Sequence, residues 1–352
     1  MSILFFHFDG TGNSPEEAAN FTADNTSLTN VLKSHVLLTQ GSLAPTDHSF
    51  YYAGVGTYGP KLARWVNSGF AFEAADIADI LRRALLDFQC HYHANVERIV
   101  LIGFSRGAAL ARRFAALIDP FLAEPIVIEA VMDTVASIGW PNLDRHQRPT
   151  QDVVFEYGCT LPNCVHKALH LVALDEQRLA FRPTLMNYDQ RVTEVWLAGA
   201  HSDIGGGYIR DGLSDISAQA LFQWLTIQLK RPELWRLTEQ VAKRIEVVWG
   251  IEPMHLQTRP NPLGQLHYQE RFKWLEELTL APRQCHVLFN GQPCPKRLPL
   301  WHHSVLQRMS KMATYRPVAQ CKGEVRSWSM LHDSGAQINT IARSSLLTKV
   351  GS

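Results

Sequence analysis

Residues 96–110, Val-Glu-Arg-Ile-Val-Leu-Ile-Gly-Phe-Ser-Arg-Gly-Ala-Ala-Leu, decide the fold class. An apolar, β-branched run leads into a Gly-x-Ser-x-Gly turn at 103–107, and small residues that favour a helix follow. This order of strand, sharp turn and helix is the context of the nucleophile elbow in α/β-hydrolases. The elbow glycines Gly103 and Gly107 leave room for the turn, so we predict Ser105 as a nucleophile at its tip.

Short apolar segments alternate with longer helical ones along most of the chain. The predicted strands are 3–8, 49–53, 98–102, 126–132 and 194–198. Residues 72–94 and 108–118 have the length and composition of helices that pack on a sheet. We therefore expect an α/β fold of the α/β-hydrolase type, with a mostly parallel central sheet and helices on both faces.

The length of 352 residues suits one large domain with insertions, which we place at 1–320. Residues 211–300 differ in composition from the preceding chain, with tryptophans among Gln, Glu, Arg and Pro. We predict that they form a helical insertion or cap, with helical periodicity at 217–229. Tryptophans at such spacing belong mainly to a core. In this region they are Trp224, Trp235, Trp249 and Trp274. Residues 321–352 are expected to be a C-terminal extension.

The composition excludes several classes of protein. The chain is 46% hydrophobic with a formal net charge of +1, which argues against disorder and against nucleic acid as a partner. No uncharged run approaches the roughly 18 residues needed to span a bilayer. The first residues lack the basic segment of a secretory signal, so we expect synthesis in the cytoplasm without a signal peptide.

The cysteines and neighbouring histidines do not predict a metal centre. Six cysteines are too few for a disulfide scaffold at this length. The pattern closest to a zinc site has an unusually wide gap between its cysteines and no second pair. Its members are Cys159, Cys164, His166 and His170. We predict no metal and no other cofactor.

A serine nucleophile needs a base and an orienting acid, which follow in the order Ser, Asp or Glu, His in this fold. Asp133 ends the predicted strand 126–132, and His201 follows the strand 194–198 and precedes three glycines. We predict these two residues as acid and base. Sequence order leaves other candidates open: Asp175 and Asp203 as the acid, and His303 and His332 as the base.

Two segments are candidates for the oxyanion hole. The backbone N–H of Arg106, at the start of the helix after the nucleophile, is the first donor. The loop Phe-Asp-Gly-Thr-Gly-Asn at 8–13 is expected to supply the second donor from Gly10 or Thr11. Such a loop also occurs in nucleotide-dependent phosphotransferases, but their fold does not need a Gly-x-Ser-x-Gly turn, so this alternative is less favoured.

Taken in order, these motifs resemble the α/β-hydrolase family of type VI secretion lipase effectors. The segments that carry the resemblance are 8–13, 52–57, 103–108, 133–135, 173–176, 199–207, 303–305 and 315–317. The resemblance implies a triad at Ser105, Asp133 and His201 that cleaves membrane phospholipids in an antibacterial toxin. It also implies export into a target-cell periplasm, with an immunity protein and a secretion-spike protein as partners. A soluble carboxylesterase or thioesterase of the same fold is the alternative.

Overall fold

The computed structural model describes residues 2–11, 13, 28–41, 43–56, 70–136, 161–208, 212–268, 279–321, 324–331 and 335–341. Within these residues the main sheet has nine strands in the order β13-β12-β10-β6-β5-β4-β3-β1-β2. All neighbouring pairs from β2 to β12 are parallel, and the edge strand β13 is antiparallel to β12. This sheet confirms the predicted α/β fold.

The strands of the main sheet are β1 (Ser2–Phe8), β2 (His48–Tyr52), β3 (Val96–Phe104), β4 (Val127–Met132), β5 (Val165–Ala173), β6 (Val192–Leu197), β10 (Leu300–His302), β12 (Val325–Leu331) and β13 (Gly335–Ile341). Two small ribbons lie outside it. One pairs β7 (Gln284–Cys285) with β11 (Gln320–Cys321), and the other pairs β8 (Leu288–Phe289) with β9 (Gln292–Pro293).

The helices are α2 (Asn30–Gln40), α4 (Phe70–His91), α5 (Arg106–Ile118), α6 (His201–Gly205), α7 (Gly212–Leu229), α8 (Glu239–Trp249), α9 (Pro253–Leu256) and α11 (His303–Lys311), with short 3-10 turns η1 (Asp119–Phe121) and η3 (Leu179–Phe181). The described part of the chain contains no helix long and apolar enough to span a bilayer.

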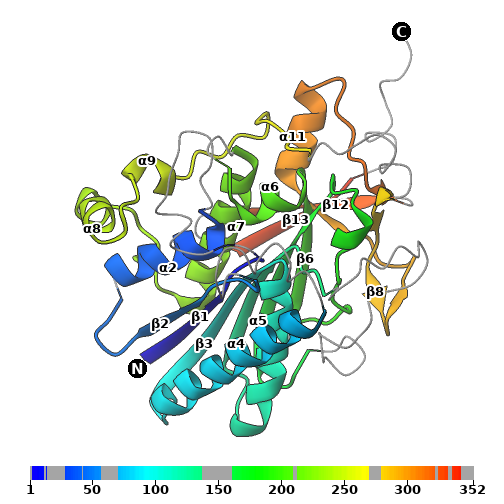
Figure 1. Cartoon of the computed structure of the whole chain (residues 1–352). Coiled ribbons are helices and arrows are strands. Elements are labelled where there is room, and N and C mark those ends of the chain that lie inside the picture. The colour runs from blue at the N-terminus through cyan, green and yellow to red at the C-terminus, as the bar shows by residue number, and fades with distance from the viewer. Residues whose placement is uncertain are drawn as a thin grey trace.

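Side chains along β1 alternate between two cores, as expected for a strand covered on both faces. Ile3 and Phe5 share a core with helices α2, α7 and α8, whereas Leu4, Phe6 and Phe8 share one with α4 and α5. The same alternation continues along β3. Helices therefore cover both faces of the sheet, as Figure 1 shows, and its carboxyl edge is left to loops.

The region predicted as an insertion contributes directly to one of these layers. Helix α7 packs on the sheet, and Trp224 and Trp235 are buried in that core as predicted, whereas Trp274 lies outside the described residues. Residues 325–331 and 335–341, predicted within a C-terminal extension, supply strands β12 and β13. The domain boundaries themselves stay a prediction.

Candidate active site

The turn after β3 has the strained geometry of a nucleophile elbow. Ser105 has φ 58° and ψ −125°, in a region that residues with a side chain rarely adopt. A Cβ on Gly107 would lie 2.2 Å from the carbonyl oxygen of Phe8, and one on Gly103 would lie 2.6 Å from Cα of Ala108. Both elbow glycines are thus required by close backbone contacts, which hold the serine in its strained conformation.

The loop that follows β6 brings a histidine to this serine. His201 begins α6, is 4% exposed, and places Nε2 2.8 Å from Oγ of Ser105. Its Nδ1 lies 2.5 Å from Oδ2 of Asp133, at the end of β4. With its hydrogen on Nδ1, the imidazole donates to the carboxylate and leaves Nε2 to accept the serine hydroxyl proton. Ser105, Asp133 and His201 therefore meet at the carboxyl edge of the sheet.

Asp133 is fully buried and surrounded by donors. Arg283 reaches both of its oxygens, with Nη1 2.6 Å from Oδ1 and Nη2 2.9 Å from Oδ2. The backbone N–H of Ala173 adds a third bond to Oδ1. Burial by itself raises the pKa of Asp133, but the charge of Arg283 and the hydrogen bond from His201 outweigh it and hold that pKa well below its usual range. The carboxylate is therefore ionised at neutral pH.

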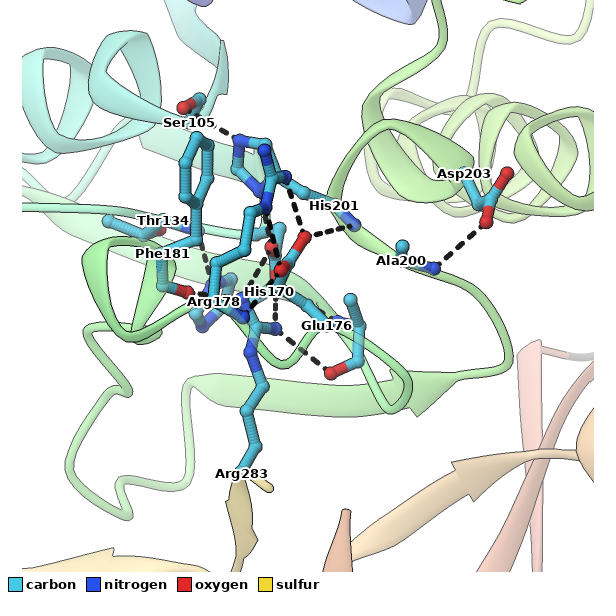
Figure 2. Close-up of polar contacts among 12 residues, drawn as sticks. Ser105, Thr134, His170, Glu176, Arg178, Phe181, Ala200, His201, Asp203 and Arg283 are labelled. Carbon is cyan, nitrogen blue, oxygen red and sulfur yellow. Dashed lines mark hydrogen bonds and ion pairs between the residues drawn. The ribbon is translucent and has the colours of Figure 1, made fainter. Parts of the chain in front are cut away.

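Two aromatic rings and one further carboxylate fix the histidine. The rings of Phe104 and Phe181 lie 4.6 and 4.8 Å from that of His201, measured between centroids. The backbone N–H of His201 donates to Glu176. Glu176 in turn accepts hydrogen bonds from Nε, Nη2 and the backbone N–H of Arg178. Figure 2 shows the His201 ring between Ser105 and the Glu176–Arg178 ion pair.

Neighbouring carboxylates in the loop after β5 have opposite pKa shifts. Burial raises the pKa of Glu176, but Arg178 overrides this with hydrogen bonds and charge, and the pKa falls to about 2. Asp175 has the neutral donors Gly199 N–H, Val318 N–H and the Tyr315 hydroxyl, so burial dominates and its pKa is raised. Asp175 therefore joins the loops that carry these three donors.

On the oxyanion side, the two predicted donors of the first loop differ. The N–H of Gly10 donates to Oδ1 of Asp9 at 2.7 Å, whereas Thr11 lies exposed at the next position. Asp9 is buried, also accepts bonds from the hydroxyls of Thr29 and Tyr51, and has a pKa raised by burial to about 6. Arg106 is the first residue of α5, so its backbone N–H lies at the start of the helix, next to Ser105.

The remaining candidates lie apart from the serine. Asp203 caps the start of α6 through Ala200 N–H and pairs with His267. His303 begins α11, where its ring packs on His302, and His332 is outside the described residues.

The described members of the zinc-like cysteine and histidine pattern bond to separate partners. Cys164 donates its thiol to the Ala115 carbonyl, and His170 pairs with Glu194, while Cys159 is outside the described residues. Within the described residues, no three His, Cys, Asp or Glu side chains are arranged to hold a metal ion.

Sequence reasoning missed the residues that surround Ser105, Asp133 and His201. Arg283 lies far along the chain from Asp133, in a segment without helical or strand periodicity, and no local pattern indicates its partner. Phe181 belongs to a single 3-10 turn. Glu176 could have been predicted as a site residue, because it belongs to the segment 173–176 that follows β5 at the same edge of the sheet as Ser105 and His201.

Comparison with known proteins identifies the family. Residues 3–121 and 123–228 match the catalytic domain of the type VI secretion system (T6SS) Tle1-like phospholipase effectors. The chain belongs to this family. A search of curated proteins finds none that matches.

Several solved structures are similar at low identity. An uncharacterized protein from Pseudomonas aeruginosa is 18% identical, with a TM-score of 0.42, over 63% of this chain and 45% of that one. The Tle1 effector bound to the VgrG spike is 21% identical, with a TM-score of 0.36, over 59% and 51%. Esterase 2 of Thermogutta terrifontis is 14% identical, with a TM-score of 0.33, over 65% and 83%. The chain thus spans about half of the first two proteins.

Proposed function

We propose that this member of the Tle1-like family is a serine acyl hydrolase of the phospholipase A type. Ser105 is the nucleophile, His201 the general base and Asp133 the orienting acid. The observation that supports this most directly is the hydrogen-bonded chain from Oγ of Ser105 through His201 to Asp133, with a strained serine at one end and a buried carboxylate at the other. That arrangement matches the roles a serine hydrolase requires.

The proposed reaction is a two-step acyl transfer. Nε2 of His201 takes the proton of Ser105 as the serine oxygen attacks the ester carbonyl. The backbone N–H groups of Arg106 and Thr11 stabilise the negative oxygen of the tetrahedral intermediate, since the N–H of Gly10 is already bonded to Asp9. The departing alcohol takes the proton from His201, and water then releases the fatty acid by the same steps.

The electrostatics support histidine as the base. Asp133 is ionised because Arg283 and His201 stabilise its charge despite complete burial. An ionised carboxylate at Nδ1 holds the tautomer in which Nε2 faces the serine, and it stabilises the imidazolium that forms during attack. No step requires a metal ion or a cofactor.

Family membership supports the biological setting that we propose. Membrane phospholipids are the proposed substrate, and the protein acts as an antibacterial effector exported by a type VI system into the periplasm of a target cell. A spike protein of that machine and a cognate immunity protein are the proposed partners. These assignments extend the family match and are separate from the chemistry of the triad.

The test is hydrolysis of phospholipid vesicles, with products analysed by mass spectrometry. Wild-type protein and Ser310→Ala, which alters an exposed serine on α11, are expected to release fatty acid and lysophospholipid. Ser105→Ala is expected to release neither. Equal release by Ser105→Ala would overturn the proposal. Serine-dependent cleavage of soluble short-chain esters, without action on vesicles, would move the function to a soluble carboxylesterase.

A further inference from the structure

A buried guanidinium contacts the acid of the proposed triad from the side opposite the histidine. Arg283 lies just before β7, and 2% of its side chain is exposed. It makes the two bonds to Asp133 described above, and it also donates to the carbonyl oxygens of Ala173 and Phe181 at 2.9 and 2.5 Å. One side chain thus joins the end of β4, the end of β5 and the turn that packs on His201.

Stability alone is a weak reason for such a group. A buried ion pair often contributes little more than apolar residues of similar volume, because both charges lose their hydration. Among the described residues, Nε of Arg283 has no hydrogen-bond partner, which adds to the cost of burying it. Burying Arg283 costs free energy, yet its guanidinium contacts both oxygens of Asp133, the proposed catalytic acid. This combination points to a role in the site.

We propose that Arg283 is a positioning residue of the active site, which fixes Asp133 against His201 and balances the charge of that carboxylate. The inference rests on the proposed function of the triad and adds a fourth member to it. Arg283 itself touches neither Ser105 nor the proposed oxyanion donors. It acts through Asp133, and through the Phe181 turn whose ring packs on the imidazole.

The direction of the effect follows from the charges around the imidazole. Among the described residues, the imidazole contacts Asp133 at the end of β4, and the backbone N–H of His201 donates to Glu176 in the loop after β5. Arg283 pairs with the first of these carboxylates and Arg178 with the second. Asp203, on the same helix as His201, bonds instead to Ala200 N–H and His267. The charge of Glu176 is balanced by Arg178. Removing Arg283 leaves the charge of Asp133 unbalanced, and an unbalanced anion favours the protonated imidazole.

The test is the titration of His201, measured by NMR on protein with isotopically labelled histidine and assigned with His201→Asn. Arg283→Met is expected to raise the pKa of His201 by about one unit or more. Arg308→Met removes another buried arginine, one that donates to the carbonyls of Pro262 and Gly264, and it is expected to leave that pKa unchanged. An unchanged pKa in folded Arg283→Met, or an equal rise in Arg308→Met, would overturn the proposal.

Two further variants separate charge from fold. Arg283→Gln keeps a donor without the charge, so it is expected to raise the pKa of His201 in the same way, and it replaces Arg283→Met if circular dichroism shows that variant unfolded. Arg283→Lys keeps the charge and is expected to keep the pKa near the wild-type value. A rise in Arg283→Lys equal to that in Arg283→Gln would show that charge is not the cause and would contradict the proposal.

Kinetics supply a second readout. Because Arg283 is buried away from the serine, Arg283→Met is expected to lower kcat by about 10²-fold with little change in KM, and to move the acid limb of the kcat/KM profile to higher pH. A rise in KM alone would argue against a positioning role. Wild-type protein without Ser105-dependent hydrolysis would refute the proposed function, whereas the NMR titration would still decide the role of Arg283.

Discussion

Two aspartate–histidine pairs in the described part of the chain differ in what surrounds them. Asp133 and His201 are 2.5 Å apart, and Asp203 and His267 are 2.6 Å apart, measured from carboxylate oxygen to Nδ1. Both carboxylates are fully buried. The first histidine places its other nitrogen on Oγ of Ser105, whereas the second stacks its ring on Tyr208 at 3.9 Å between centroids.

The difference shows that a short aspartate–histidine contact does not by itself identify a catalytic pair. Asp203 accepts backbone bonds from Ala200 and His267, so its role is to hold α6 and the chain near 267 in place. Asp133 has a strained backbone with φ 42°, an arginine partner and a histidine aimed at a strained serine. The first pair is the one that we propose for catalysis, and the second supports the helix on which His201 lies.

The largest expected effect is that of Asp133→Asn. The amide removes the charge and disturbs the hydrogen bond that selects the imidazole tautomer, so kcat is expected to fall by about 10⁴-fold with the fold retained. Steady-state assays of ester hydrolysis, with circular dichroism as the check on folding, measure this. A loss no greater than that in Asp203→Asn would erase the distinction between the two pairs.

The proposed oxyanion loop provides the next largest effect. A Cβ on Gly54 would lie 1.7 Å from the carbonyl oxygen of Gly10, so Gly54→Ala must displace the loop that carries Thr11. Loss of one oxyanion donor costs about 10²-fold to 10³-fold in kcat, and we expect a loss near the lower value. Gly41→Ala is the matched control, because its Cβ would meet the Leu37 carbonyl at 2.3 Å, at the end of α2. Equal kcat in the two variants would count against the loop.

Glu176 links the site to the pH dependence of stability. Its pKa in the folded protein is about 2, below the ordinary value of 4.5, so its ionised form stabilises the fold above about pH 4.5. That contribution, on the order of 3 kcal/mol, is lost as the pH falls toward 2.

Glu176→Gln is therefore expected to be less stable than wild type at pH 7, and the difference should narrow at pH 3. Urea unfolding at pH 7 and pH 3 measures this difference in stability. Glu239→Gln is the control, because the side chain of Glu239 is 84% exposed. A constant difference between wild type and Glu176→Gln at the two pH values would contradict the assignment.

The smallest effect is expected for Asp203→Asn. Loss of the charged cap on α6 and of the His267 pair should lower the free energy of unfolding by about 1–2 kcal/mol. Since His201 begins the same helix, kcat is expected to fall, but by about tenfold or less. Denaturant unfolding and the ester assay on one preparation test both statements. A large kcat loss with unchanged stability would show that the second pair takes part in the chemistry.

The sequence predicted the elbow and the positions of the triad candidates because each follows a strand, and parallel strands end at one edge of a sheet. The same reasoning could not separate Asp133 from Asp175 and Asp203, which also follow strands of that sheet. Strand β5 escaped prediction because His166, Lys167 and His170 interrupt its apolar run.

Arg283 could not be found from sequence for a different reason. Its contact with Asp133 joins segments far apart in the chain, and the two-residue strand next to it has no periodic signal. Such a partner depends on how the loops fold back over the carboxyl edge. The members of such a side-chain network come together only in the folded protein.

The central claim, that Ser105 is an activated nucleophile, is tested most directly by labelling the folded protein with a fluorophosphonate probe and mapping the adduct by peptide mass spectrometry. The account predicts a single adduct on the peptide that contains Ser105, strongly slowed in His201→Ala and absent in Ser105→Ala. No adduct on folded wild-type protein, or an adduct on a different serine, would contradict it.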